Sequence, residues 1–379
     1  MKYLMIVYFL TIGALAWFSY GFLDPNLTLS TNPLFTRIQA PLSNLVYHNR
    51  PLATTVFLLI LLGLFYSYAK FLQVADKLFI SWRRLFLLLF ASSTILVLSY
   101  PALSYDLFNY ITTAKVTFTY HENPYIVMPT EIPNEPYLAF TRAANKVALY
   151  GPVWLLLTVV PYTLGNDQIW QTIITFKIMN ALVYICFSYF IYKVTKNIKN
   201  VLFFAFNPLI LIEVLVSGHN DIYMMILALG GLYLWQNNRI SVKVTGLVFF
   251  ILSWFVKGST LVLLPLIFMK KLPWEKLLFL AYYLLLIVFI VVAPLREELY
   301  PWYAVWLISV ASFMDFKKQT FIVGFTIVLS FALELRHLPY MWMGYYEAPG
   351  PIFRLLLTVI PLAFYGIYLA VKRARKQTV

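Results

Sequence analysis

An aspartate and a tyrosine lie four residues apart in the polar segment YDLFNYITTAKVTFTYHENPY, residues 105–125. On a helix, Asp106 and Tyr110 share one face. Asp106 follows Pro101 and a long apolar stretch within five residues, a position from which a carboxylate can accept a proton as a general base. An aspartate at this position can also cap a helix, so the spacing alone leaves both roles open.

A second group of ionisable residues lies in NPLILIEVLVSGHND, residues 207–221. Glu213 stands within an apolar stretch, where a carboxylate is costly and usually faces a cavity or a cationic partner. His219, Asn220 and Asp221 crowd the turn that follows. A polar turn with Asp221 as an N-cap is the structural alternative. The unexplained cost of Glu213 favours a functional site.

Three cations complete the set of candidate groups. Lys177 lies well inside an apolar stretch, Lys257 separates two short ones, and Arg296 lies in PLREELYPWY. A lysine suits a phosphate as a point charge, and an arginine suits it through two parallel hydrogen bonds. An ion pair between Lys177 and Glu213 would be purely structural, and the sequence does not choose between the two roles.

The composition indicates the kind of protein that positions these residues. The chain has 379 residues, of which 61% are hydrophobic and 12% charged. Soluble domains are about half apolar and about a quarter charged, so this chain belongs to the polytopic membrane class. A single cysteine, Cys186, excludes an intrachain disulfide framework. No His/Cys cluster has metal-ligand spacing, so we expect no metal site and no cofactor.

The apolar stretches predict about 12 transmembrane helices in an all-α fold, since a span needs about 20 mostly apolar residues. The stretches are 3–22, 52–69, 85–101, 168–192, 200–216, 221–236, 242–256, 258–270, 277–293, 301–315, 319–335 and 351–371. The first continues past ALA (14–16), so we expect an uncleaved span rather than a signal peptide. The run 151–165 is short and contains Pro161, which is typical of an interfacial or re-entrant helix.

The basic residues predict the orientation. If 151–165 does not cross and the N-terminus is cytoplasmic, 19 of the 29 basic residues fall inside, as the positive-inside rule favours. If 151–165 crossed, every basic cluster from Lys193 onward would move outside. We therefore expect a multi-pass cell-membrane protein with both termini cytoplasmic. The net charge of +14 then reflects orientation rather than nucleic-acid binding.

This orientation gives the polar segments a side. Residues 102–150 face outward, as do the loops at 217–221, 257, 294–300 and 336–350. We expect one integral membrane domain, residues 1–379, with an outward-facing catalytic loop at 102–150 and an interfacial or re-entrant segment at 151–165. YPWYAVW (300–306) is typical of an interfacial aromatic belt, although aromatic faces also stack on sugars.

The segment YDLFNYITTAKVTFTYHENPY resembles the first catalytic loop of multispanning GT-C glycosyltransferases, with its D-x-x-x-Y and N-P-Y pattern. It is most similar to the polyprenol-phosphate-mannose-dependent mannosyltransferases of bacterial envelopes. Four further blocks agree in order: YGPVW (150–154), NPLILIEVLVSGHND (207–221), FVKGSTLVLLP (255–265) and YPWYAVWL (300–307). Two features depart from the pattern. His121 stands where relatives often carry glycine, and no second acidic residue adjoins Asp106.

The resemblance implies that a hexose, mannose by default, moves from a polyprenyl-phosphate donor to an envelope glycan or glycolipid on the outer face. Asp106 would take the proton of the acceptor hydroxyl, and a single displacement would invert the anomeric carbon. Lys177, Lys257 or Arg296 would stabilise the departing phosphate. The substrate-binding candidates are Tyr110, Asn123, Tyr125, Tyr150, Glu213, His219, Asn220, Asp221 and Tyr303.

Two other classes of protein stay open at this point. A transporter or flippase of a lipid-linked sugar also suits twelve helices and cytoplasmic termini, but such folds usually carry two matching halves. The long polar segment 102–150 has no counterpart in the second half of the chain. A structural subunit of an envelope complex would have no need of Asp106.

Overall fold

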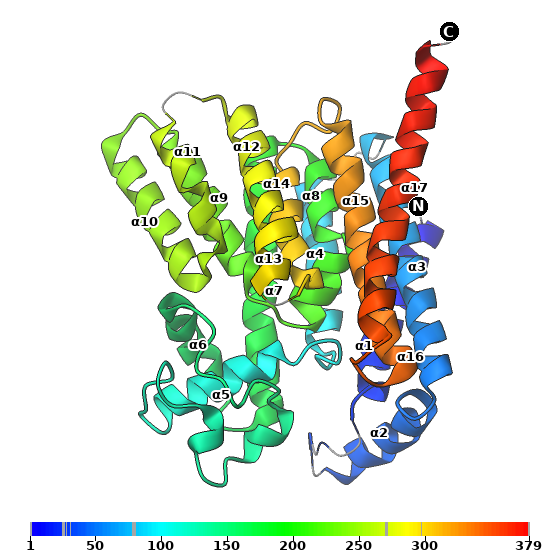
Figure 1. The fold of residues 1–379 in the computed structure, drawn as a ribbon, viewed down its shortest axis with the longest axis vertical. Coiled ribbons are helices and arrows are strands. Elements are labelled where there is room, and N and C mark those ends of the chain that lie inside the picture. Colours follow the sequence, from blue (N-terminus) through cyan, green and yellow to red (C-terminus); the bar gives the residue numbers. More distant parts are fainter. Residues whose placement is uncertain are drawn as a thin grey trace.

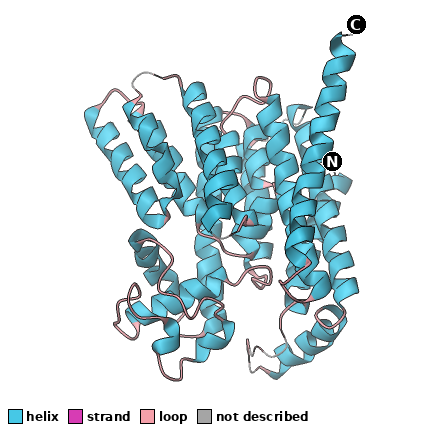
Figure 2. Ribbon diagram, in the orientation of Figure 1, coloured by secondary structure: helices cyan, strands magenta, loops and turns pink. Residues whose placement is uncertain are grey.

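The computed structural model consists of helices and loops (Figure 2). It describes the chain except for residues 1, 25–26, 28, 31, 78–80, 270–271, 297 and 378–379. Helix makes up 78% of the residues and no strand occurs in the described part, which confirms the predicted all-α class.

Six helical segments of the described chain are long and apolar enough to cross a bilayer, as expected for a membrane protein. Four of them are α1 (Lys2–Gly21), α3 (Arg50–Val74, followed by η1, Ala75–Lys77), α7 (Ile169–Thr195) and α17 (Gly350–Gln377). The other two are composite: α12 (Trp274–Ile287) with η6 (Val288–Val292) and α13 (Ala293–Arg296), and α15 (Thr320–Glu334) with η8 (Leu335–His337) and α16 (Leu338–Met343).

Five other predicted spans coincide with shorter helices. These are α4 (Trp82–Val97), α9 (Asp221–Trp235), α10 (Ile240–Val256), η5 (Gly258–Leu263) with α11 (Leu264–Phe268), and η7 (Pro301–Tyr303) with α14 (Ala304–Ala311). The described residues therefore contain six helices of membrane length, or seven if the bent pair below counts as one span. The count of twelve stays a prediction.

The predicted span 200–216 is broken rather than straight. Helix α8 (Ile198–Ala205) and the π-helix η4 (Ile210–Val216) meet at 62°. Pro208 lies at the break. Proline lacks a backbone N–H and disfavours helical backbone in the residue before it, so the helix is interrupted here. That residue, Asn207, stabilises the bend. Its Oδ1 accepts a hydrogen bond from Leu209 N at 3.0 Å, and its Nδ2 donates to Ser330 at 3.2 Å.

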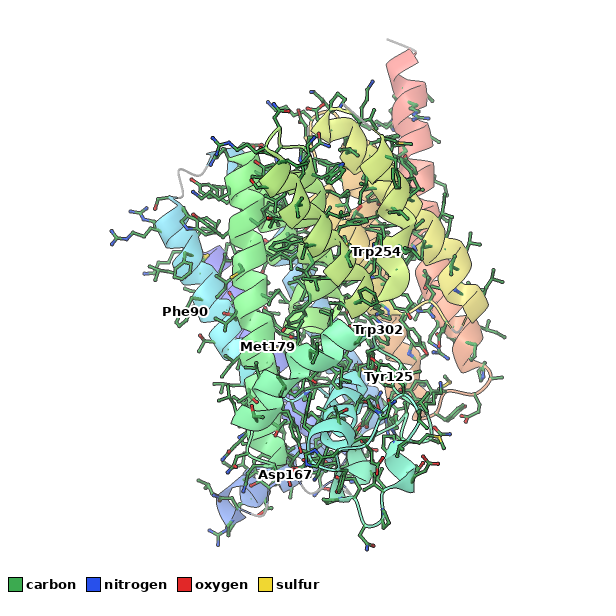
Figure 3. All side chains as sticks on the ribbon, turned by 90° about the vertical axis from the view of Figure 1, so that its left-hand side faces the viewer. Phe90, Tyr125, Asp167, Met179, Trp254 and Trp302 are labelled. Carbon is green, nitrogen blue, oxygen red and sulfur yellow. The ribbon has the colours of Figure 1, made fainter. Side chains whose placement is uncertain are left out.

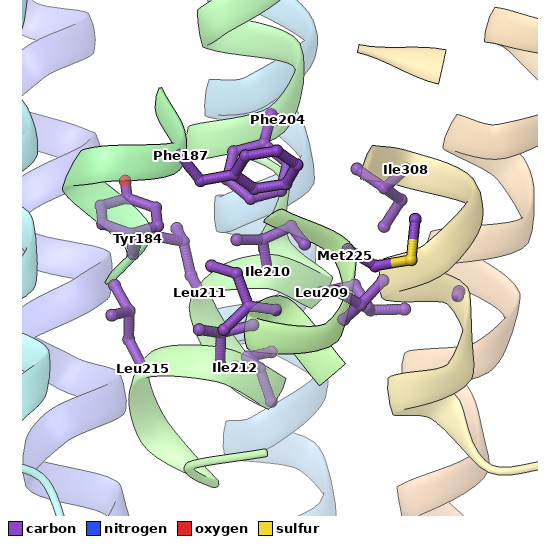
Figure 4. Packing of buried hydrophobic residues seen from close by; sticks show 14 of the residues in the cluster. Tyr184, Phe187, Phe204, Leu209, Ile210, Leu211, Ile212, Leu215, Met225 and Ile308 are labelled. Atoms are coloured by element: carbon purple, nitrogen blue, oxygen red, sulfur yellow. The ribbon is translucent and has the colours of Figure 1, made fainter. Parts of the chain in front are cut away.

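Segment η4 is fully buried in the hydrophobic core (Figure 4). Fully buried side chains from four helices surround it: Tyr184 and Phe187 of α7, Phe204 of α8, Met225 of α9 and Ile308 of α14. In a bilayer, where lipid tails are as apolar as leucine, close packing of this kind holds helices together. A side chain carried by η4 is therefore held in a fixed position.

The segment 102–165 forms a layer at one end of the helix bundle (Figure 1). This loop layer contains α5 (Asp106–Phe118), η2 (Pro129–Glu131), η3 (Pro136–Phe140) and α6 (Pro152–Leu164). The C-terminal end of α17 lies at the opposite end of the molecule. A further helix, α2 (Pro33–Val46), lies on the same side as the loop layer, and a search for long apolar stretches does not find it because polar residues interrupt its apolar ones.

A buried lysine ties the loop layer together. Lys115 of α5 forms ion pairs with Glu135 at 3.3 Å and with Asp167 at 3.0 Å, and it lies over the ring of Tyr137 at 4.1 Å. Asp167 follows the layer in sequence and lies toward the same end of the molecule (Figure 3). These contacts join α5 to the middle of the segment and to the turn that follows it.

Helices α9 and α10 form a hairpin with touching backbones. A Cβ atom on Gly231 of α9 would lie 2.7 Å from the carbonyl oxygen of Gly246, and one on Gly246 of α10 would lie 2.7 Å from that of Gly231. Such close approach through small residues is common between membrane helices. The two helices of the hairpin are therefore in direct backbone contact at these glycines.

Candidate active site

Asp106 is the first residue of α5, and its side chain is 25% exposed. Its Oδ1 accepts a hydrogen bond from Asn109 Nδ2 at 3.4 Å. Asn109 in turn accepts a hydrogen bond from the backbone N–H of Ala143 at 3.2 Å, which joins the start of α5 to the far part of the loop layer. Asp106 is thus both held in place and accessible, as a general base must be.

His219 lies behind Asp106 and is fully buried. Its Nδ1 is 3.3 Å from Asp106 Oδ2, and its Nε2 is 3.1 Å from Glu213 Oε2. One face of the imidazole stacks on Trp302, with ring centroids 4.0 Å apart and planes 19° apart. Figure 3 shows Trp302 where the bundle meets the loop layer.

Glu213 continues this row of ionisable groups into the bundle. It is fully buried in the π-helix η4, a kind of helix that occurs often at functional sites. Its Oε1 lies 3.0 Å from Nε2 of His337, at the end of η8. The cationic partner expected for Glu213 is His219, and the imidazole of His337 lies against the other carboxylate oxygen. The alternative partner, Lys177, lies elsewhere.

The environment of His219, in the turn between η4 and α9, changes its basicity. Burial lowers the pKa of the imidazole, but the nearby carboxylates of Asp106 and Glu213 more than offset this and raise the pKa to about 9. The ring is therefore cationic at neutral pH and lies between two anions.

A second ion pair, between Asp221 and Lys257, joins the start of α9 to the end of α10. Lys257 Nζ contacts both oxygens of Asp221, at 2.9 and 3.0 Å, and the indole N–H of Trp306 donates to Asp221 at 2.6 Å. The ammonium also lies 4.8 Å from the centre of the Tyr303 ring. Asp221 is fully buried, whereas the Lys257 side chain is 21% exposed.

Aromatic side chains connect these groups to the loop layer. The hydroxyl of Tyr110 accepts a hydrogen bond from the backbone N–H of Asn220 at 3.4 Å. The Tyr110 ring packs edge-on against Tyr150 and Trp154, with centroids 4.6 and 4.9 Å away. A small pocket lies beside these three rings. Asp106 and Tyr110 are thus on the same side of α5, as their spacing predicts.

The NPY segment contacts Tyr150 from the other direction. Asn123 Oδ1 accepts a hydrogen bond from the backbone N–H of Tyr125 at 3.0 Å, and the Tyr125 hydroxyl donates to the Tyr150 carbonyl at 3.0 Å. His121, which stands where glycine is common in relatives, has a φ of 55°. That left-handed backbone is the one glycine adopts without strain, so the loop keeps the shape that glycine favours.

The other two candidate cations are Lys177 and Arg296. Lys177 is fully buried, and its ammonium donates to the carbonyl and the hydroxyl of Ser99 at 2.5 and 2.6 Å. Arg296 ends α13, and its side chain lies outside the described part of the structure. The structure brings together Asp106, Tyr110, Tyr150, Glu213, His219, Asn220, Asp221, Lys257 and Tyr303. It does not connect Lys177 to them.

Comparison with known proteins identifies the chain. Residues 11–272 match a family described as alpha-(1->6)-mannopyranosyltransferase, N-terminal domain. The chain belongs to this mannopyranosyltransferase family. The result confirms the resemblance to mannosyltransferases of bacterial envelopes, and it supports a glycosyltransferase with a sugar donor and a glycan acceptor. No curated protein and no solved structure matches the chain.

The part that matches the mannopyranosyltransferase family includes Asp106, His219 and Lys257 but ends before Trp302 and His337. Sequence reasoning missed these last two as site residues. The cost argument that selected Glu213 also applies to Glu334, at the end of an apolar stretch, and would have directed attention to the neighbouring His337. Trp302 carries no comparable signal, because it lies in a segment typical of an interfacial belt.

Proposed function

We propose that this member of the mannopyranosyltransferase family transfers mannose from a polyprenyl-phosphate donor to an envelope glycan or glycolipid, with inversion and with Asp106 as the general base. The observation that carries the proposal is the position of Asp106. Its carboxylate is partly exposed at the start of α5, and His219 holds it from the buried side at 3.3 Å.

The reaction is a single displacement. The acceptor hydroxyl loses its proton to Asp106 as its oxygen forms a bond to the anomeric carbon. The bond between that carbon and the phosphate oxygen breaks, and the electron pair leaves with the polyprenyl phosphate. His219 keeps Asp106 in place during the proton transfer, and Glu213 holds His219 from the opposite side at 3.1 Å.

Convergence of distant segments supports a reaction at one end of the bundle. Contacts of His219, Asp221 and Glu213 bring together the loop layer, the turn 217–221, Lys257, Trp302 and His337. The positive-inside rule assigns residues 102–150, the turn 217–221, Lys257 and His337 to the outer face, and Trp302 lies at the outer start of the predicted span 301–315. A polyprenyl donor keeps its tail in the bilayer and its phosphate at the interface, so we place the reaction on that face.

The remaining site residues act in binding. Lys257, which contacts Asp221 of the assembled site, is the first candidate for the donor phosphate, and Lys177 and Arg296 are the other two. Tyr110, Asn123, Tyr125, Tyr150, Glu213, His219, Asn220, Asp221 and Tyr303 surround the sugar and the acceptor. The whole chain acts as one membrane domain, with 102–150 as the catalytic loop and 151–165 at the membrane surface.

The test is sugar transfer by protein purified and returned to lipid, with radiolabelled polyprenyl-phosphate-mannose and a membrane glycolipid extract. Asp106→Asn keeps the shape of the side chain but removes its basicity, so we expect transfer to fall by about 10²–10⁴-fold. Glu275→Gln, which removes an exposed carboxylate paired with Lys318, serves as the matched control. Near-normal transfer by a well-folded Asp106→Asn protein would remove Asp106 as the base.

A further inference from the structure

Glu213, Glu334 and His337 converge in the interior of the bundle. One ligand atom from each lies within 4.8 Å of the other two. His337 Nε2 is 3.0 Å from Glu213 Oε1 and 3.9 Å from Glu334 Oε2. Both carboxylates are fully buried, and the side chain of His337 is 13% exposed.

Glu334 is the residue that the proposed reaction leaves unexplained. Neither of its carboxylate oxygens has a hydrogen-bond partner, although the side chain is fully buried. A buried carboxylate without a partner is strongly unfavourable, and buried charges in proteins are usually paired or bound to a metal. The nearby Glu213 increases the cost, since two carboxylates repel one another.

The arrangement is that of a metal site. Glu334 and His337 stand three residues apart on one helical turn, the Glu-x-x-His spacing that directs both side chains inward in metal-binding helix bundles. Bonds of about 2.0–2.2 Å to a central ion put its ligand atoms roughly 3–4 Å apart, close to the spacings found here. A dication would also neutralise the two carboxylates.

We propose that Glu213, Glu334 and His337 bind one divalent transition-metal ion, Zn²⁺ or Mn²⁺. An imidazole ligand favours Zn²⁺ over Mg²⁺ and Ca²⁺, which prefer oxygen ligands alone, and Glu-x-x-His pairs also bind manganese in helix bundles. The ion holds Glu213, which in turn holds His219 against Asp106. This departs from the expectation of no metal, because no local spacing in the sequence joins Glu213 to the other two ligands.

The experiment measures metal bound to the purified full-length protein after its affinity tag has been removed. The protein is stripped with a chelator, incubated separately with Zn²⁺, Mn²⁺ or Mg²⁺, desalted, and analysed by mass spectrometry for metal per chain. We expect one Zn²⁺ or Mn²⁺ per wild-type chain and little Mg²⁺. Glu334→Gln and His337→Gln should lose the ion, and Glu275→Gln should keep it.

Thermal unfolding gives a second readout. Bound metal stabilises the native state, so Zn²⁺ or Mn²⁺ should raise the melting temperature of the wild type but not of Glu334→Gln. Asp106→Asn should keep the metal while losing transfer, which separates this proposal from the proposed reaction. The proposal would be overturned if the wild-type protein retained no more metal than the two ligand variants. It would also be overturned if metal did not change the melting temperature of the wild type, a result that does not depend on whether a variant folds.

Discussion

His219 is the residue on which the candidate site depends. It contacts Asp106 of the loop layer, Glu213 of the core and Trp302 of η7, three parts of the chain that are distant in sequence. Its own position follows from Gly218, whose φ of 84° gives the turn a left-handed backbone that other residues rarely adopt. A small shift of this one ring would therefore directly disturb Asp106, the proposed general base.

The ring of Trp302 stacks on the imidazole of His219. The ring of Tyr300 also stacks on Trp302, with centroids 4.4 Å apart. Replacing Trp302 with leucine removes this stack, which is worth about 0.5–1.5 kcal/mol, so we expect kcat/KM for mannosyl transfer to fall by up to about tenfold. Trp302→Phe keeps an aromatic face and should restore most of the activity. Equal activity of the leucine and phenylalanine variants would contradict a supporting role for the ring.

Some of these residues could be recognised from the sequence, and physical reasons separate them from the others. Glu213 is recognisable because a charge in an apolar stretch demands a local explanation. Asp106 and Tyr110 are recognisable because helical periodicity is local. The contacts of Glu213 with His337 and of His219 with Trp302 depend on tertiary packing, which no local pattern contains.

At the scale of elements, the close contact between α6 and α10 explains the block YGPVW. Gly151 donates its backbone N–H to the carbonyl of Val256 at 3.2 Å, and a Cβ atom at this position would lie 2.0 Å from the carbonyl oxygen of Phe255. The loop layer thus meets the bundle directly beside Lys257. A side chain at residue 151 would force the two elements apart.

We therefore expect Gly151→Ala to destabilise the protein by about 1–3 kcal/mol, the usual cost of inserting a methyl group into a filled space. It should lower both the melting temperature in detergent and the rate of transfer. Gly258→Ala is the matched control, because a Cβ atom there meets nothing within 4 Å. If both variants melted at the wild-type temperature, the close contact between Gly151 and Phe255 would be contradicted.

The elements show where hydropathy predicts structure and where it does not. Each apolar stretch coincides with helical structure, because a chain in lipid must pair its backbone groups internally. Hydropathy gives no information on the bend at Pro208 or on α2, whose helix carries a mixed surface. These features depend on proline geometry and on neighbouring helices.

At the scale of the whole molecule, the loop layer and the loop between α9 and α10 should lie on opposite sides of the membrane. Asn145 of the loop layer and Asn238 between α9 and α10 are both exposed. In a background where Cys186 has been replaced by alanine, Asn145→Cys should react with a membrane-impermeant maleimide in intact cells, whereas Asn238→Cys should react only after lysis. Labelling of both cysteines in intact cells would contradict the predicted orientation.

The α9–α10 hairpin carries both members of one ion pair. Asp221 begins α9, Lys257 directly follows α10, and the contact of Gly231 with Gly246 fixes the two helices against each other. The pair is therefore built into a continuous segment of chain rather than assembled from separate ones. A chimera that moves residues 221–257 of this chain into another member of the family would therefore carry both members of the ion pair with it.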